Sequence, residues 1–350
     1  MTTNESSPVA AASHMTTGDM DLLGEASAAA KALEIEIGRV IVGQRPIVRA
    51  MLTAVFAQGH ALLIGVPGLA KTLLVRTLAQ SLGWTFRRIQ FTPDMMPSDI
   101  VGMELLQENA VTGRREMHFM HGPVFANLVL ADEINRTPPK TQSALLEAMQ
   151  ELTVTSLGKT YPIERPFLVF ATQNPIEQEG TYPLPEAQLD RFMFSLWLDY
   201  PSRGEEEAIV AATTDERATE GRAVIDRERV IAFQRLVRRV PVAHHAVAYA
   251  VAIARATRPR DEAASEWAKK YVEWGAGPRA SQHMILAAKA LAVLDGRTSV
   301  SAGHVREAAA NVLRHRVLPN YTAAGDGITT AALVDRILAD VQEPTYAATA

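Results

Sequence analysis

The stretch Ala61-Leu62-Leu63-Ile64, followed by Gly65-Val66-Pro67-Gly68-Leu69-Ala70-Lys71-Thr72, decides the fold. Four apolar residues in a row are typical of a short strand buried on both faces, and the pattern of Lys71–Leu82 predicts a helix. Strand, glycine-rich loop and helix, in this order, are the context of a phosphate-binding loop, because backbone N–H groups of the loop and the helix N-terminus can bind phosphate oxygens. Lys71 is then the candidate to reach the β- and γ-phosphates, and the Thr72 hydroxyl the candidate to bind Mg²⁺. One departure is Ala70, since the strict pattern has glycine before the lysine.

Three further short apolar runs predict more buried strands of the same kind: Leu128–Ala131, Phe167–Ala171 and Phe192–Leu198. Helical patterns, notably Lys71–Leu82 and Lys140–Glu151, alternate with them. This alternation predicts a parallel α/β sheet covered by helices on both faces. Two β-rich insertions are also expected, an excursion over Gly102–Phe125 and a hairpin over Leu152–Ile163. Insertions of this kind often carry a partner surface.

Polar residues follow two of these strands at the edge where parallel sheets bind ligands. Asp132 and Glu133 end the second strand; Asp132 could hold Mg²⁺, and Glu133 could orient and polarise an attacking water. Asn174 follows the third strand and could contact a γ-phosphate or that water. The alternatives are ordinary ones: Asp132 and Glu133 could cap the next helix, and Asn174 could form a turn before Pro175.

Two arginines complete the candidate set. Arg191 directly precedes the strand at Phe192–Leu198. Arg279 follows Pro278 at the start of a helix predicted over Ala280–Leu294, where a cation opposes the helix dipole and is better explained by a nearby anion. For either arginine alone, an ordinary surface charge is the alternative.

Length and composition limit the number of domains and the kinds of chemistry that the chain can carry. The 350 residues predict two domains: a tail at 1–20, an α/β domain at 21–200, an all-α domain at 201–342 and a tail at 343–350. The absence of cysteine excludes disulfides and thiolate chemistry. No apolar run is long enough to span a membrane and no basic leader begins the chain, so we expect a cytoplasmic protein.

The charge balance argues against a nucleic-acid partner. With 35 basic and 39 acidic residues the net charge is −4. The segment Arg222–Arg239 contains six arginines and could form a nucleic-acid track. The interleaved Asp226 and Glu228, together with apolar residues at helical spacing, instead favour a solvated helix face.

Taken in order, these motifs resemble the AAA+ ATPases and, among them, the MoxR family. The resemblance covers about residues 22–340. It rests on Val42-Gly43-Gln44, Gly65–Thr72, Phe91-Thr92-Pro93-Asp94 with Pro97-Ser98-Asp99, Gly122–Asn127, Asp132–Arg136, Glu147–Glu151, Ala171–Pro175, Leu184–Phe192 and Gly277–Ala280.

The resemblance implies a role for each candidate residue. Gly65–Thr72 matches Walker A, in which Ala70 is usual for MoxR proteins, and Asp132 with Glu133 matches Walker B. Asn174 matches sensor 1, Arg191 the arginine finger and Arg279 sensor 2, while Val42 and Gly43 match the segment that lines the adenine pocket. The insertions match a helix-2 insert and the hairpin before sensor 1, and the helical region matches the AAA+ lid.

The resemblance also implies ATP and Mg²⁺ as cofactors and a homo-oligomeric ring, in related proteins a hexamer. It further implies a chaperone-like or maturation role, with a partner bearing a von Willebrand factor A domain. The alternatives are a nucleic-acid motor or a magnesium-chelatase-like subunit with the same insert. A non-hydrolysing scaffold is a third alternative, against which the intact Glu133 argues.

Overall fold

The protein is described from a computed structural model, which covers residues 15–108, 115–156, 158–177, 179–214 and 221–344. The first half contains α1 (Thr17–Val40), α2 (Arg45–Ala57), β1 (Ala61–Ile64), α3 (Lys71–Ser81), β2 (Phe86–Gln90), α4 (Pro97–Val101), β3 (Gly102–Glu108), β4 (Arg115–His121), β5 (Leu128–Asp132), a 3₁₀ turn (Ile134–Arg136), α5 (Pro139–Glu151), β6 (Thr153–Ser156), β7 (Lys159–Pro162), β8 (Leu168–Gln173), α6 (Glu186–Leu189) and β9 (Phe194–Trp197).

The second half is mainly helical. It contains α7 (Arg203–Thr213), α8 (Arg227–Arg239), α9 (His244–Ala256), α10 (Glu266–Tyr271), β10 (Val272–Trp274), α11 (Pro278–Leu294), α12 (Ala302–Leu313), β11 (Leu318–Pro319), α13 (Tyr321–Gly325) and α14 (Thr330–Asp340). The small antiparallel pair β10–β11 interrupts a region that the sequence predicts to be without strands. It was missed because two or three residues are too few to show a strand pattern.

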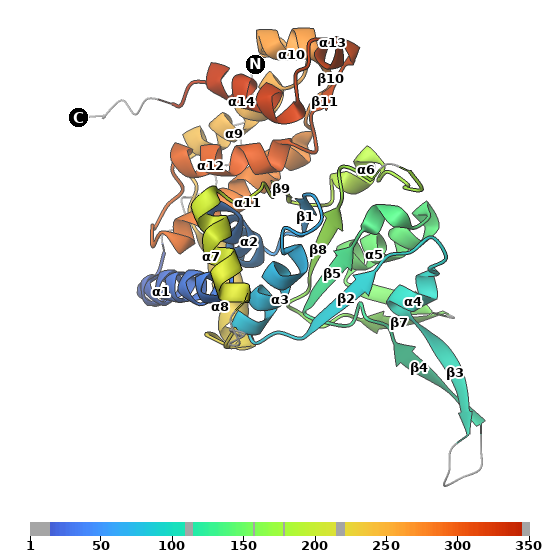
Figure 1. The fold of residues 1–350 in the computed structure, drawn as a ribbon. Helices are drawn as coiled ribbons and strands as arrows, with labels where there is room; N and C mark the ends of the chain where they lie inside the picture. The colour runs from blue at the N-terminus through green and yellow to red at the C-terminus, as the bar shows by residue number, and fades with distance from the viewer. Residues whose placement is uncertain (1–14, 109–114, 157, 178, 215–220, 345–350) are drawn as a thin grey trace, which may run out of the picture.

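A five-stranded parallel sheet forms the centre of the first half, in the order β2-β5-β8-β1-β9. This confirms the predicted α/β class and all four predicted strands. β2 is an addition, because it lies at the edge of the sheet and carries exposed Arg87 and Arg88 rather than a continuous apolar run. The predicted insertions form the hairpins β3–β4 and β6–β7. In Figure 1 the β3–β4 hairpin projects away from the body of the molecule, at the end opposite α10, α13 and α14.

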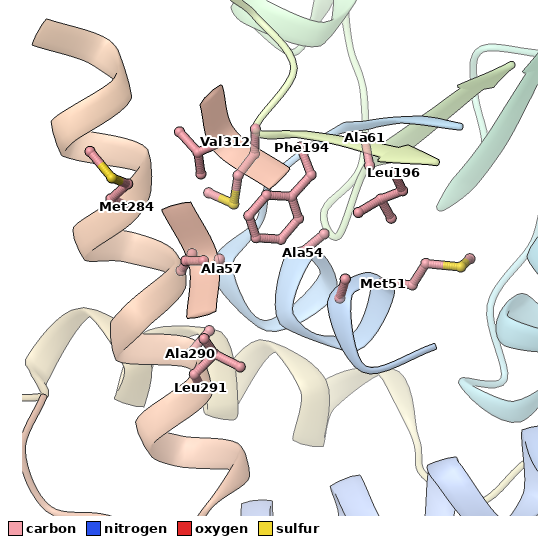
Figure 2. Close-up of a cluster of buried hydrophobic side chains, with 14 of the residues drawn as sticks. Met51, Ala54, Ala57, Ala61, Phe194, Leu196, Met284, Ala290, Leu291 and Val312 are labelled. Carbon is pink, nitrogen blue, oxygen red and sulfur yellow. The ribbon is translucent and has the colours of Figure 1, made fainter. Parts of the chain in front are cut away.

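Side chains of the strands alternate between two apolar cores, one on each face of the sheet. Leu63, Leu130 and Phe170 belong to the core that includes α1, α2 and α3. Their neighbours point to the other core, which includes α4 and α5. The first core continues into the second half of the chain: Figure 2 shows Val312 of α12 next to Phe194 of β9, with Met284 of α11 at the far side of the same cluster.

The two halves therefore share one core, and the expected domain division near residue 200 stays a prediction. At the N-terminus, α1 begins at Thr17, four residues inside the predicted tail, because Thr16 and Asp19 form a capping box. The remaining tail residues 1–14 and 345–350 lie outside the described residues. Within the described stretches, every helix is too short or too polar to cross a bilayer.

Candidate active site

The candidate phosphate-binding loop, Gly65–Thr72, joins β1 to α3, and three of its small residues determine its backbone shape. A side chain at Gly65 would press on the Cβ atom and carbonyl oxygen of Leu198, each 3.1 Å from its Cβ position. Gly68 has a φ of +88° and open space around it. Ala70 also adopts a left-handed backbone, with φ 55° and ψ 25°, immediately before the first residue of α3. The loop thus keeps a glycine-like conformation at the position where alanine departs from the strict pattern.

Lys71 directs its ammonium group into this loop. Its Nζ donates hydrogen bonds to the carbonyl oxygens of Gly65 (2.6 Å) and Val66 (2.8 Å). Partial burial lowers the pKa of Lys71, and the charges of Asp132 and Glu133 oppose that shift. The lysine therefore lies between the loop and the carboxylates at the ends of the strands, where a cation can bind phosphate oxygens.

Asp132, the last residue of β5, is buried and shared by several donors. The Thr172 hydroxyl donates to its Oδ1 (2.6 Å), and the Thr72 hydroxyl lies 3.4 Å from its Oδ2. Arg88 on β2 pairs with the same Oδ2, its Nη2 at 2.7 Å. The hydroxyl of Thr72 and the carboxylate of Asp132 are oxygen donors of the kind Mg²⁺ binds, so the predicted pair is close enough to fit the metal. In the structure, Arg88 is bonded to one of the two oxygens of that carboxylate, Oδ2.

Glu133 is held in place by its backbone and its side chain. Its φ is 57°, and its N–H donates to the Thr172 hydroxyl (2.8 Å). Its Oε2 accepts a hydrogen bond from Gln90 Nε2 (2.9 Å) and lies 3.1 Å from Arg136 Nε. Arg136 also pairs with Glu177, and this contact lowers the pKa of Glu177. The carboxylate of Glu133 is therefore held by Gln90 of β2 and by Arg136.

Asn174 follows β8 and is buried beside the same strand ends. Its Oδ1 accepts from the backbone N–H of Ile176 (3.3 Å). Its Nδ2 is buried and makes no hydrogen bond of ordinary geometry within the described part of the chain, although the amide lies close enough to Glu177 to help lower the pKa of that carboxyl. A buried donor without a partner is costly, and an oxygen of a bound phosphate or water would satisfy it.

Val42 and Gly43 lie between α1 and α2 and line a cavity of about 1030 Å³ with residues of α11 and α12. Residues of the phosphate-binding loop do not line that cavity, and the carboxyl group of Glu205 covers Gly43. The role of Val42 and Gly43 in binding adenine thus stays a prediction.

Arg191 and Arg279 lie elsewhere. Arg191 Nη1 donates to the carbonyl oxygen of Leu146 on α5 (2.7 Å), and Arg279 Nη1 donates to Asp190 Oδ2 (3.1 Å). The segment that carries Asp190 and Arg191 enters the sheet where the Met193 N–H donates to the His60 carbonyl (2.7 Å), just before β1. The phosphate-binding loop leaves the other end of β1. The fold brings Lys71, Thr72, Asp132, Glu133 and Asn174 together but not these two arginines.

Four polar residues at the site were given no role from the sequence: Arg88 and Gln90, which lie outside every motif, and Arg136 and Thr172, which lie within two of them. Gln90 and Arg88 alternate on β2, and their polarity was the reason that strand went unrecognised. Polar side chains at an exposed sheet edge, two residues apart, are the signal that could have found them.

The arginine-rich segment proves to be an intramolecular contact surface. The pairs formed by its side chains are Arg227–Glu164, Arg229–Glu25 and Arg239–Asp19. Three of its six arginines thus pair with carboxylates of other elements while their side chains stay 35–49% exposed, as on a partly solvated helix face.

Comparison with known proteins gives concordant matches. Residues 60–194 match the family described as "ATPase family associated with various cellular activities (AAA)", and residues 264–337 match an AAA lid domain. The chain is 45% identical to Chaperone MoxR1 of Mycobacterium tuberculosis over 88% of this chain and 81% of that protein. It is 31% identical to Protein MoxR of Methylorubrum extorquens over 86% of this chain and 90% of that protein. The crystal structure of a candidate ATPase from Cytophaga hutchinsonii aligns with a TM-score of 0.84 at 38% identity, covering 94% of this chain and 98% of that one.

Proposed function

The chain belongs to the MoxR family of AAA+ ATPases, and from this premise we propose that it hydrolyses ATP with Mg²⁺ and uses the energy to remodel partner proteins. One observation carries the hydrolytic part of the proposal. Lys71, Thr72 and Asp132 meet at the carboxyl edge of the sheet, with Glu133 and Asn174 beside them. Phosphoryl transfer to water uses a cation, metal-binding oxygens, a carboxylate and an amide donor, and the site contains each of these groups.

Each residue has a part in this proposal. The loop Gly65–Thr72 binds the phosphates through its N–H groups, and Lys71 neutralises the β- and γ-phosphates. Thr72 and Asp132 would hold Mg²⁺, which polarises phosphate oxygens when bound. Glu133 orients a water and accepts its proton, and Asn174 donates its buried amide N–H to the γ-phosphate or to that water.

Arg191 would complete the site from a neighbouring subunit. It lies near the end of β1 opposite the phosphate-binding loop and bonds to α5 instead. An arginine of this type stabilises charge in the transition state and is worth about 10³–10⁵ in rate where it acts in other NTPases. A head-to-tail interface that repeats and closes gives a ring, and we propose a hexamer.

The chaperone-like role follows from the family, since the Mycobacterium tuberculosis relative bears the name Chaperone MoxR1. We extend it to a partner with a von Willebrand factor A domain, as the resemblance suggests. The exposed β3–β4 hairpin, with Met103, Leu106, Met117 and Met120 in contact with solvent, offers a surface for such contacts. Three of the α8 arginines pair with carboxylates of this chain, which argues against a nucleic-acid track on that helix.

ATPase assays on three proteins test the proposal. The wild type should show Mg²⁺-dependent turnover, Lys71→Ala should lose nucleotide binding, and Glu133→Gln should bind ATP but hydrolyse it at a rate lower by about 10² or more. Light scattering after size-exclusion chromatography, with and without ATP, checks the ring. Glu133→Gln as bait, with Lys71→Ala as the matched control, should retain the partner in the presence of ATP. Normal hydrolysis by Glu133→Gln would refute the assignment of the base.

A further inference from the structure

Arg316, in the turn after α12, is a buried arginine that no sequence motif singles out. Its side chain is 2% exposed. Its Nε donates to Asp190 Oδ1 (2.7 Å) and its Nη2 to His283 Nδ1 (2.9 Å). The remaining contacts go to the carbonyl oxygens of Asp190, Phe192, Met193 and Val312. Every N–H of the guanidinium thus faces an acceptor, and three of these carbonyls belong to the segment that leads into β9.

Asp190 divides its two carboxylate oxygens between two arginines. Oδ1 accepts from the buried Arg316, and Oδ2 accepts from Arg279 (3.1 Å), whose side chain is 45% exposed. Arg316 cannot leave Asp190 without stranding a buried charge, whereas Arg279 is held by this single described contact and can exchange it for another anion. Burial lowers the pKa of Arg316 to about 10, and Asp190 opposes that shift.

Asp190 also adjoins Arg191 in the chain. Its segment is a tight turn, in which the N–H groups of Arg191 and Phe192 donate to the carbonyl oxygens of Gln188 (3.2 Å) and Leu189 (3.0 Å). The exposed Arg279 comes from α11, about ninety residues further along the chain than the half-buried Arg191. The carboxylate of Asp190 holds Arg279 against the segment that carries Arg191.

We propose that Asp190 and Arg316 are positioning residues: Arg316 fixes Asp190, and Asp190 holds Arg279 against the segment that carries Arg191, so that one subunit presents both arginines to the phosphates bound by its neighbour. The inference rests on the proposed ATPase function and on the supply of Arg191 by a neighbouring subunit. Its consequence is that the helical half of the chain and the segment bearing Arg191 move as one body.

The test compares Asp190→Asn with Arg191→Ala and with Asp19→Asn. Asp19 is a matched control because it is a largely buried carboxylate paired with Arg239 on α8, outside the site. Asp190→Asn should leave the Kd for a fluorescent ATP analogue within about twofold of wild type, while kcat at saturating protein falls by about tenfold or more. Asp19→Asn should change neither quantity by more than about twofold.

A double-mutant cycle separates positioning from a general structural role. If Asp190 acts through Arg279, adding Asp190→Asn to Arg279→Ala should lower kcat by no more than about a further twofold. Asp190→Glu, which keeps the charge, should recover part of kcat. If Asp190→Asn does not fold, Asp190→Asn with Arg316→Gln removes both charges, avoids the stranded cation and should show the same loss of kcat with unchanged Kd.

Two results would overturn the inference: a kcat of Asp190→Asn within twofold of wild type, or fully multiplicative effects in the cycle with Arg279→Ala. Failure of the proposed function looks different. In that case the wild type does not hydrolyse ATP, or Arg191→Ala is fully active. A wild type that hydrolyses ATP, an inactive Arg191→Ala and a normal Asp190→Asn together would refute the positioning role alone.

Discussion

Ala70 shows how a residue can depart from a sequence pattern and still keep the geometry that the pattern encodes. Its φ of 55° places a side-chain-bearing residue in the left-handed region, which costs roughly 1–2 kcal/mol relative to glycine. The neighbouring contacts of Lys71 with Gly65 and Val66 are nevertheless formed. The sequence could predict this loop because its signal is local: strand, turn residues and helix follow one another within about a dozen positions.

Arg88 could not be predicted in the same way, because its role depends on the pairing of β2 with β5. In the fold its guanidinium lies 2.7 Å from Asp132 Oδ2, on the carboxylate proposed to hold the metal. Gln90 reaches Glu133 from the same strand by the same register. Which residues of an edge strand face a site is a matter of strand register, and β2 lacked the apolar pattern by which register is read.

The contact between Arg88 and Asp132 leads to a prediction about Mg²⁺. Because Arg88 competes for Asp132, Arg88→Gln should lower the Mg²⁺ concentration for half-maximal ATPase activity by about two- to tenfold. Arg87→Gln is the matched control, since Arg87 is the exposed neighbour on the same strand. Titration of Mg²⁺ at saturating ATP measures the effect. A higher Mg²⁺ requirement in Arg88→Gln would mean that the arginine assists metal binding instead.

At the scale of elements, continuous apolar runs identified β1, β5, β8 and β9 because both faces of these strands are covered. The two insertions were located by turn residues and alternation, and the structure gives them as separate two-stranded hairpins. What the sequence could not supply is how the β3–β4 hairpin joins the body. That junction depends on close backbone contacts between Gly102, Gly122 and α4, which leave no trace in hydrophobic periodicity.

The close backbone contacts at this junction predict that a side chain at position 122 destabilises the protein. A Cβ atom there would collide with the Ile100 carbonyl and the Gly102 N–H, both backbone groups that cannot rotate away. Gly122→Ala should therefore lower the free energy of unfolding by about 1–3 kcal/mol and speed hydrogen exchange in β3 and β4. Gly24→Ala is the control, because Gly24 lies within α1 with open space around it and should be neutral or stabilising. Equal effects of both substitutions in urea unfolding would contradict the steric argument.

At the scale of the whole molecule, the sheet and the helical half are joined through buried polar groups as well as the shared core. His60, which precedes β1, bonds within the first half, to the Met149 carbonyl (3.3 Å) and the Val169 N–H (3.0 Å). The contacts between the halves come from His283 on α11 and from His315 after α12, whose Nε2 donates to the Phe192 carbonyl (3.0 Å). Arg316 lies between the last two. These contacts join residues that are between 33 and 123 positions apart in the chain. No local sequence pattern could therefore have predicted them.

The buried histidines predict a pH dependence of stability. Burial lowers the pKa of His60 to about 4 and of His283 to about 3, and it places the pKa of His315 well below its usual value, with Arg316 adding to the shift in the last two. Unfolded histidine binds a proton near pH 6.5, so acid favours the unfolded chain. The free energy of unfolding should hold above pH 7 and fall as the pH drops from about 6.5, by about 1 kcal/mol for each histidine at pH 5.5. Urea unfolding at pH 7.5 and 5.5 measures this, and equal values would contradict it. His244→Asn, at an exposed position, should leave the difference unchanged.

The separation of Arg191 from the phosphate-binding loop predicts complementation between two inactive proteins. A Glu133→Gln subunit lacks the base but keeps Arg191, and an Arg191→Ala subunit lacks the arginine but keeps Glu133. If Arg191 acts on the neighbour, a mixed ring contains interfaces at which an intact base meets an intact arginine. In an equimolar random mixture these are one interface in four, so activity should recover to about a quarter of wild type from near zero in either parent. Lys71→Ala mixed with Glu133→Gln is the control and should stay inactive, because neither subunit combines phosphate binding with an intact base. Absence of recovery in rings shown to exchange subunits would place Arg191 in its own subunit's chemistry, against the geometry of β1 and β9.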